Sequence, residues 1–339
     1  MTLRGARGRL AHMEATMSIS ARRFDRASRF TALALLAVAA ACSKVNETRP
    51  SIDLEPLLSP EATEVPTVID DSIPEEYRRQ IILAQTMGKR LFIDDRAAWL
   101  AGDVIEAAGL REKYADINVG WQTMELGPGF SDWAVISVGK NGEHFVKFAT
   151  VTVHFSNPES TDPLRDPGTK YSLSEHPDLP KLEPAEALLF GLRQTALQGN
   201  YLRCSNVVNA TSYFFRDLDN EEGKDYVVVD IMPGRLDESI YYLGGQHEYR
   251  FNLKDDEKFT HYSQTKTCPM MQAEPGKSPL ALTISHLNSE TPTLFHTFAS
   301  LDYGLPLYVV TSQNSLLWKV EGSKISLIEK IEDSDELSE

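Results

Sequence analysis

Short apolar segments alternate with turn-rich segments through the C-terminal half of the chain. The ten candidate strands lie at Val207–Phe215, Tyr226–Met232, Ile240–Leu243, His247–Leu253, Phe259–Cys268, Leu280–Leu287, Thr293–Leu301, Leu307–Ser312, Leu316–Val320 and Ile325–Ile328. Such spacing is typical of strands joined by turns. Because no connection is long enough for a crossover helix, the sequence predicts an antiparallel meander.

A helix and a smaller group of strands precede this half. Apolar or small residues recur every three or four positions at Tyr77, Ile81, Ala84, Gly88 and Leu91. This period predicts an amphipathic helix from Pro74 towards Gly109, and Asp94-Asp95 is a place where it could break. Strands are then expected at Trp121–Leu126, Trp133–Val138 and His144–Phe155. Asn141-Gly142 between the last two is a strong hairpin signal.

A second helix is expected after Glu183-Pro184, ending near Gly199-Asn200. Residues 156–183, which are rich in Ser, Pro, Asp and Glu, show no period and are predicted to be a long loop or linker. The sequence therefore predicts an α+β fold of two helix-plus-antiparallel-meander units, with the C-terminal sheet the larger.

The N-terminal segment has the three parts of a secretory signal. Four arginines, Arg22, Arg23, Arg26 and Arg29, precede the apolar run Phe30–Val38, and Ala39-Ala40-Ala41 follow. Together with the three alanines the apolar segment is about a dozen residues long, whereas a membrane-spanning helix needs roughly 20. Met17 gives a more ordinary start to such a signal than Met1 does.

Cys42 directly follows the small residues, and with them the segment resembles a bacterial lipoprotein signal. The resemblance implies lipidation of the Cys42 thiol, which would become the first mature residue and anchor the chain to the membrane. The match is imperfect, since Ala39 stands where a larger aliphatic residue is usual. An ordinary signal-peptidase site at Ala39-x-Ala41 and an uncleaved anchor are the alternatives. By resemblance to lipoprotein sorting patterns, Ser43 favours the outer membrane. No family resemblance extends over the mature body.

The mature chain would be strongly acidic. Of 34 Lys and Arg and 49 Asp and Glu, seven Arg and two acids precede Cys42, which leaves 27 and 47 and a net charge of −20. Such a surface repels nucleic acid and anionic lipid headgroups, so neither is an expected partner. A hydrophobic content of 42% is sufficient for a packed core.

The two remaining cysteines, Cys204 and Cys268, would lie in an oxidising compartment. There they are expected to form a disulfide, which in the chain-entropy model adds roughly 4 kcal/mol to the free energy of unfolding. Two buried free thiols are the alternative. Neither cysteine lies in a C-x-x-C pattern.

His286 and His296 are the best candidates for a functional face. If Leu280–Leu287 and Thr293–Leu301 paired as a hairpin, both imidazoles would share one mostly apolar face on a diagonal of roughly 7–8 Å. With Glu290 or His261 they could ligate a metal. The plainer interpretation, which we adopt, is two packing histidines without metal, at least one of them buried. Ser285 would face away from His286 and so form no nucleophile–base pair.

Asp217–Gly223 has glycine in the wrong place for a calcium loop, and no nucleotide-binding or hydrolase signature is present in the sequence. We therefore assign no catalytic residues and no cofactor. The expected organisation is a signal peptide (1–41), a flexible tether (42–73), a helix with strands (74–155), a long loop (156–183), a second helix with a long meander (184–328) and an acidic tail (329–339).

The sequence is best interpreted as a lipid-anchored, periplasm-facing binding protein of the bacterial cell envelope, with another envelope protein as its partner. Two alternatives remain open. One is an envelope hydrolase that uses the His286/His296 face, and the other is an immunity or inhibitor lipoprotein that blocks a basic enzyme.

Overall fold

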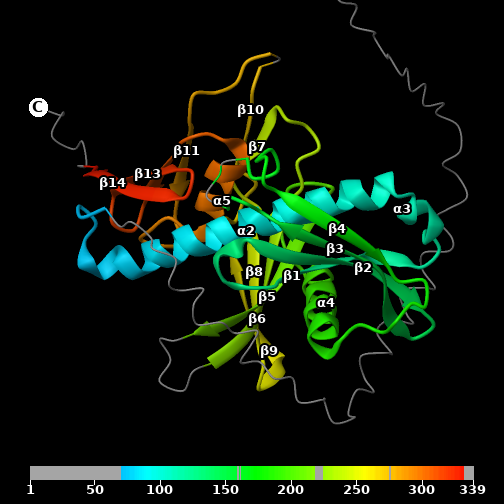
Figure 1. The fold of residues 1–339 in the computed structure, drawn as a ribbon. Helices are drawn as coiled ribbons and strands as arrows, with labels where there is room; N and C mark the ends of the chain where they lie inside the picture. Colours follow the sequence, from blue (N-terminus) through cyan, green and yellow to red (C-terminus); the bar gives the residue numbers. More distant parts are fainter. Residues whose placement is uncertain (1–69, 159, 161, 218–223, 275, 332–339) are drawn as a thin grey trace, which may run out of the picture. The chain divides into compact units, whose positions relative to one another are not determined.

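The computed structural model describes residues 70–158, 160, 162–217, 224–274 and 276–331, which all belong to one compact unit, Ile52–Glu339. Its helices are α2 (Glu75–Ala107), α3 (Leu110–Lys113), α4 (Pro184–Leu197) and α5 (Leu294–Tyr303), and residues Pro128–Phe130 form a 3-10 turn (Figure 1). Cys42 and the predicted signal and tether lie outside the described residues, except for the last positions of the tether.

Within the described residues, the strands form three four-stranded sheets and one two-stranded pair. The first sheet contains β1 (Asn118–Glu125), β2 (Asp132–Asn141), β3 (His144–His154) and β4 (Lys170–Glu175) in that order. The second contains β5 (Val208–Asp217), β6 (Lys224–Pro233), β8 (His247–Asn252) and β9 (Asp255–Ser263). The third contains β11 (Leu282–His286), β12 (Leu307–Thr311), β13 (Leu316–Glu321) and β14 (Lys324–Lys330), while β7 (Ile240–Tyr242) pairs with β10 (Met270–Gln272).

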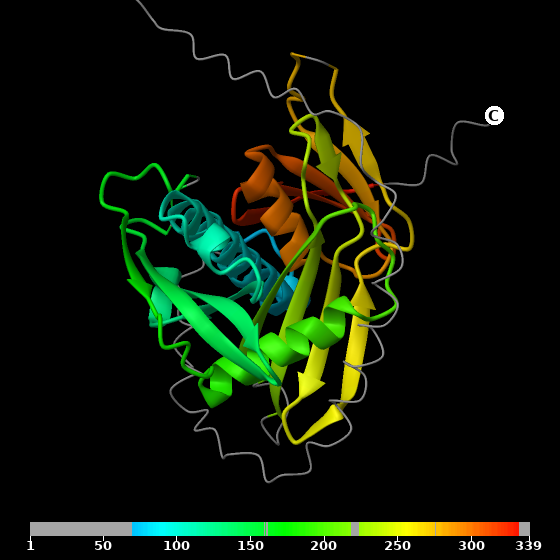
Figure 2. The same cartoon turned by 90° about the vertical axis from the view of Figure 1, so that its right-hand side faces the viewer.

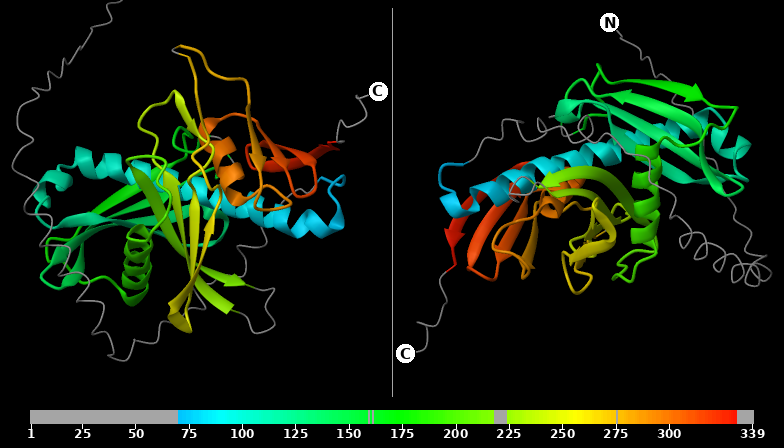
Figure 3. Two further views of the ribbon diagram at one scale, coloured as in Figure 1. Left: turned by 180° about the vertical axis from the view of Figure 1, so that it is seen from behind. Right: turned by 90° about the horizontal axis from the view of Figure 1, so that it is seen from below.

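Helix α2 contacts two of the main hydrophobic cores. Phe92 and Ala97 pack with Trp133 of the first sheet, whereas Ile81 packs with Trp318 of the third. Figure 3 shows α2 running past both groups of strands. The helix is continuous through Asp94-Asp95, so the break that the sequence allowed does not occur.

Helix α4 begins after Glu183, where Glu183 and Glu186 form a reciprocal capping box. Leu189 and Leu192 pack on Val229 and Phe251 of the second sheet, and Figure 2 shows α4 crossing those strands. Phe190 packs instead on the first sheet. The second sheet thus has α4 on one face. Its other face is turned towards α2.

The predicted α+β fold, with antiparallel sheets and the larger sheet region in the C-terminal part, is confirmed. The hairpin at Asn141-Gly142 is also confirmed, since Asn141 pairs with His144 and Gly142 takes a φ of 61°. The predicted long loop 156–183 is wrong in one respect: it contains the exposed edge strand β4, which pairs with β3.

The strand predicted at Thr293–Leu301 is wrong. Helix α5 begins at Leu294 instead, with Thr293 as its N-cap and a capping box between Thr293 and His296. The helix connects β11 to β12, which pair in parallel, so the C-terminal region is not antiparallel throughout. The nine residues predicted as a strand lie in this crossover, whose helix is ten residues long.

Among the described helices, none has both the length and the apolar character of a membrane span.

Candidate functional site

His286 and His296 do meet, although not as partners in a hairpin. His286 ends β11 and His296 is the third residue of α5, and their rings lie edge to face with centroids 4.9 Å apart. Both side chains are buried, at 1% and 2% exposure. The predicted hairpin was wrong, because the second segment is a helix and not a strand. The connection from β11 to α5 nevertheless brings the two rings together.

Their surroundings favour the neutral form of both histidines. Burial lowers the pKa of His286 to about 4, and burial together with His286 lowers the pKa of His296 well below its usual value. The backbone N–H of Thr293 donates to His296 Nδ1 at 2.9 Å, and the Gln264 amide lies 2.9 Å from Nε2. The histidine of the capping box is thereby fixed in place by hydrogen bonds.

The residues proposed as a third metal ligand are elsewhere. Glu290 is exposed, and its backbone carbonyl accepts a hydrogen bond from Asn314. His261 is on β9, where it lies 3.2 Å from His247 Nδ1 and stacks on Tyr249. No group of three or more His, Cys, Asp or Glu side chains within the described ranges is placed to hold a metal ion.

Ser289, which sequence reasoning did not single out, contacts His286. Its Oγ lies 2.8 Å from His286 Nε2 and donates to the Thr291 carbonyl at 2.6 Å. His286 Nδ1 has no hydrogen-bond partner among the described residues. The contact resembles a nucleophile–base pair without the acid that would orient the base.

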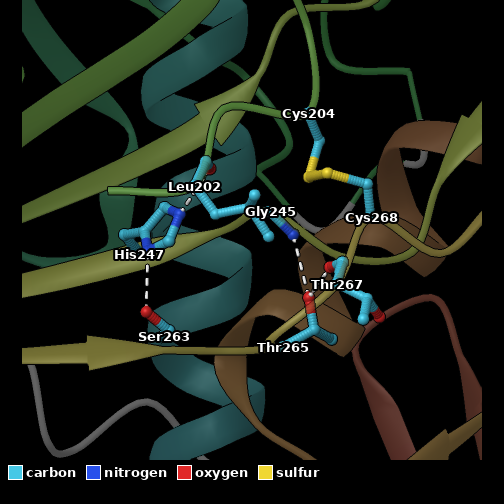
Figure 4. The surroundings of a disulfide bond; sticks show 8 residues. All are labelled: Leu202, Cys204, Gly245, His247, Ser263, Thr265, Thr267 and Cys268. Carbon is cyan, nitrogen blue, oxygen red and sulfur yellow. Dashed lines mark hydrogen bonds between the residues drawn. A yellow bond between two sulfur atoms is a disulfide. The ribbon is translucent and has the colours of Figure 1, made fainter. Parts of the chain in front are cut away.

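Cys204 and Cys268 lie at disulfide distance, with sulfur atoms 2.06 Å apart and Cα atoms 5.4 Å apart, as the predicted bridge requires. Figure 4 shows the bridge beside Gly245, whose N–H donates to Thr265 Oγ1. A Cβ at Gly245 would lie 2.4 Å from Cys204 Sγ, and the residue has a φ of 85°, so both space and backbone require glycine. The bridge ties the segment after α4 to the segment after β9.

A cavity of about 430 Å³ lies beside the two histidines, between α2, the second sheet and the start of α5. We call it the apolar pocket. Its apolar lining includes Leu83, Met87, Phe215, Val228, Leu294 and Phe295. Ser289 and Thr293 lie at its wall, so the pocket begins where the His286/His296 region ends. The predicted His286/His296 face thus lies behind the apolar pocket. The spacing of apolar residues in the sequence did not indicate this pocket.

Three polar side chains of the apolar pocket, Glu248, Arg250 and Tyr213, have polar partners within the protein. Arg250 Nε donates to Glu248 Oε1 at 2.6 Å, and Tyr213 OH donates to Asp230 Oδ2 at 3.1 Å. The Arg90 guanidinium lies 4.0 Å from the centroid of the Tyr213 ring. These contacts fix the orientations of the side chains that surround the apolar surface.

Asp230 lies behind the pocket and opposes Glu248 across β6 and β8. Burial, with the neighbouring charge of Glu248, raises the pKa of Asp230 well above its ordinary value, so the protonated form is favoured. The sequence does contain a signal for this group, because Asp230 interrupts the continuous apolar run Val227–Met232. A carboxyl group within such a run needs a buried polar partner.

Comparison of the chain with protein-family models, with curated proteins and with solved structures found no match.

Proposed function

We propose that this chain is a non-catalytic binding protein of the bacterial cell envelope, anchored through lipid on Cys42 and facing the periplasm, and that the apolar pocket receives an apolar group of its partner. The apolar lining, enclosed by polar groups that already bond to one another, carries this proposal. Binding pockets combine a mostly apolar surface with a few oriented polar groups. A catalytic group would need a free, positioned proton donor or acceptor.

The acidic composition supports a protein partner that is basic. A net charge of −20 on the mature chain would speed association with such a partner and suppress association with nucleic acid. Another envelope protein satisfies this description. A basic enzyme that the chain inhibits satisfies it too.

The apolar pocket can be tested with the uncharged fluorophore N-phenyl-1-naphthylamine and the full chain carrying Cys42→Ser, which removes the lipid. We expect saturable binding of one molecule. Thr260→Trp, which places an indole at the exposed edge of the pocket, should weaken binding about 10-fold, equivalent to about 1.4 kcal/mol. Leu236→Trp, at a position 76% exposed and outside the pocket, is the control. Absence of saturable binding, or equal affinities for all three proteins, would contradict the proposal.

The partner can be sought by placing a photoreactive benzoylphenylalanine at position 260 in living cells, with position 236 as the control. Discrete adducts with a basic envelope protein at position 260 only would support the assignment. Identical adduct patterns at the two positions would count against the pocket as the contact surface.

Anchoring is tested separately. Cys42→Ser should abolish metabolic labelling by palmitate, because the thiol is the expected attachment point. Equal labelling of wild type and variant would refute the lipoprotein interpretation.

An envelope hydrolase is the second candidate, and the contact between Ser289 and His286 is the observation that favours it. Against it, the lowered pKa of His286 makes a weak base, and the Ser289 hydroxyl is directed to the Thr291 carbonyl. A fluorophosphonate probe decides between the two. Labelling that is lost in Ser289→Ala but kept in Ser285→Ala would establish the hydrolase.

A further inference from the structure

A second cavity, of about 580 Å³, shares no lining residue with the apolar pocket. It lies at the C-terminal half of α2, against α3, β1 and one residue of β5. Two indoles line it, Trp99 from α2 and Trp121 from β1. We call it the tryptophan cavity. Trp99 is 55% exposed, which is unusual for so large an apolar side chain.

Small residues create this space. Ala98, Ala101 and Gly102 of α2 and Gly120 of β1 line the cavity where larger side chains would fill it. A Cβ on Gly102 would find no atom nearer than the Arg111 guanidinium at 4.0 Å. Helix α2 therefore packs loosely at the tryptophan cavity. In its N-terminal half, at Gly88, it packs tightly against α5.

Asp95 is a largely buried carboxylate that lines the cavity and has only long polar contacts. Its side chain is 10% exposed. The nearest cation, the Arg96 guanidinium, lies 3.8 Å from Asp95 Oδ2 but forms its close ion pair with Asp302. The amide of Asn209 is 3.5 Å from Oδ1, at the limit of a hydrogen bond.

The electrostatic surroundings of Asp95 are negative. Burial raises the pKa of Asp95 to about 7, with further contributions from Asp302 on α5 and Asp94 on α2, while Arg96 acts in the opposite direction. A carboxylate in this position gains more from an added cation than a solvated one does, because the low local dielectric strengthens the attraction.

Asp103 adds a second carboxylate to the lining. Asp95, Trp99 and Asp103 are spaced four residues apart and so lie along one side of α2. Arg111 is the one cationic side chain of the lining, and its guanidinium is paired with Glu106 Oε2 at 2.7 Å. The cavity thus combines two indole rings with a carboxylate, Asp95, whose nearest cation is 3.8 Å away. The Arg193 guanidinium lies 4.7 Å from the centroid of the Trp121 ring, so this indole already contacts one cation of the protein.

We propose that the tryptophan cavity binds a small organic cation, an alkylammonium whose charge pairs with Asp95 and whose apolar groups pack on Trp99 and Trp121. Indole is the best aromatic partner for a cation, and cages of aromatic rings recognise quaternary ammonium groups. A neutral polyhydroxy ligand would leave the Asp95 charge unbalanced. A metal ion would gain little from indole rings, which supply it with no ligand atoms.

Calorimetric titration of the full chain carrying Cys42→Ser tests this with tetramethylammonium, choline and cadaverine at pH 8. We expect saturable 1:1 binding of at least one cation, and at least 10-fold weaker binding of 3,3-dimethylbutan-1-ol, the neutral isostere of choline. If none of the three cations binds, the proposal is wrong. Equal affinity for the neutral isostere, or binding of glucose instead, also overturns it.

Two variants locate the site. Asp95→Asn should weaken binding about 10-fold or more, and Trp99→Ala about 5-fold, within the range of a partly desolvated cation–π contact. Glu76→Gln removes the same charge from the exposed start of α2 and should leave affinity unchanged. Unchanged affinity in Asp95→Asn, with the melting temperature showing a folded protein, rejects the assignment.

Binding should also tighten between pH 6 and pH 8 as Asp95 loses its proton. The charged groups that face it are Asp94 and Arg96 on α2 and Asp302 on α5, while β5 contributes only the amide of Asn209. Asp95→Asn should remove this pH dependence. If the dependence persists in the variant, another group is responsible and the role of Asp95 is refuted.

Discussion

The carboxylates of the two cavities along α2 differ in how closely each is paired with a cation. In the apolar pocket, Glu248 is paired with Arg250 at 2.6 Å. In the tryptophan cavity, the cation nearest to Asp95 is held by Asp302. A closely paired carboxylate orients its neighbours, whereas one whose polar contacts are as long as those of Asp95, at 3.5 Å and 3.8 Å, can gain more from a cationic ligand. The apolar pocket therefore offers a ligand mainly apolar surface, whereas the tryptophan cavity also offers it a carboxylate.

Two glycines of α2 show the same contrast in packing. A Cβ on Gly88 would lie 2.5 Å from both the Leu294 carbonyl oxygen and Thr297 Cβ, at the place where α2 meets α5. Gly102, at the tryptophan cavity, has open space around it. The missing side chain allows close contact between α2 and α5 at Gly88, and it leaves space for the tryptophan cavity at Gly102.

The largest effect is expected from removing the disulfide, which is near the strands that wall the apolar pocket but touches none of the tryptophan cavity. Cys204 and Cys268 are 64 residues apart. Replacing both with Ala should lower the free energy of unfolding by about 4 kcal/mol, because a long loop is released in the unfolded chain. Urea unfolding measures the change, and reduction of the wild type should reproduce it. Identical curves for reduced and oxidised protein would show that the bridge contributes nothing.

Asp95→Asn should stabilise the fold at alkaline pH. Since the folded-state pKa of Asp95 is raised to about 7, the folded protein loses stability as the pH rises from about 4 to 7, and the loss persists above 7. At pH 8 the variant should gain up to about 4 kcal/mol in the free energy of unfolding, and at pH 4 nothing. Urea unfolding at both pH values, with the exposed Asp103→Asn as the control, checks this. A gain that does not depend on pH would place the cause in packing.

His286 should act in the opposite sense. Because its folded-state pKa is lowered to about 4, stability is fully present above pH 6.5 and falls as the pH drops towards 4, by about 3 kcal/mol. His286→Gln should lose stability at pH 7 and show a smaller further loss on acidification. His144→Gln, at an exposed position, should behave as the wild type does. An unchanged acid dependence in His286→Gln would assign the effect elsewhere.

The smallest effects concern the two glycines. Gly88→Ala should cost about 2 kcal/mol, since α5 must move to admit a methyl group. Gly102→Ala should stabilise the protein by about 0.5–1 kcal/mol, because alanine favours the helix and nothing lies in its way. Thermal unfolding distinguishes the signs. If both variants destabilise the protein equally, the packing contrast between the two cavities is wrong.

Several elements were predictable because their signals are local. The three- and four-residue spacing from Tyr77 to Leu91 predicts α2, and Glu183-Pro184 predicts the start of α4. Asn141-Gly142 predicts the β2–β3 hairpin through the backbone conformation that glycine permits. Each of these depends on neighbouring residues, which a single sequence displays directly.

The errors fall where a local pattern had two interpretations. Thr293–Leu301 is apolar enough for a strand, yet the capping box of Thr293 and the tight contact with Gly88 select a helix. Strand β4 consists entirely of exposed residues and alternates only briefly, at Tyr171-Ser172-Leu173, and its pairing with β3 is what makes it a strand. In both segments a contact with a distant part of the chain, α2 for α5 and β3 for β4, helped to select the secondary structure.

The sequence alone determined the class of fold and the pairing of the two remaining cysteines. Only the tertiary structure decided which charges are satisfied. Glu248 and Asp95 each have an arginine close by in the sequence, Arg250 and Arg96. Their difference arises because Arg250 pairs with Glu248, whereas Asp302, which comes from the distant helix α5, pairs with Arg96. Local spacing encodes helices and strands, whereas charge balance depends on residues brought together from distant parts of the chain.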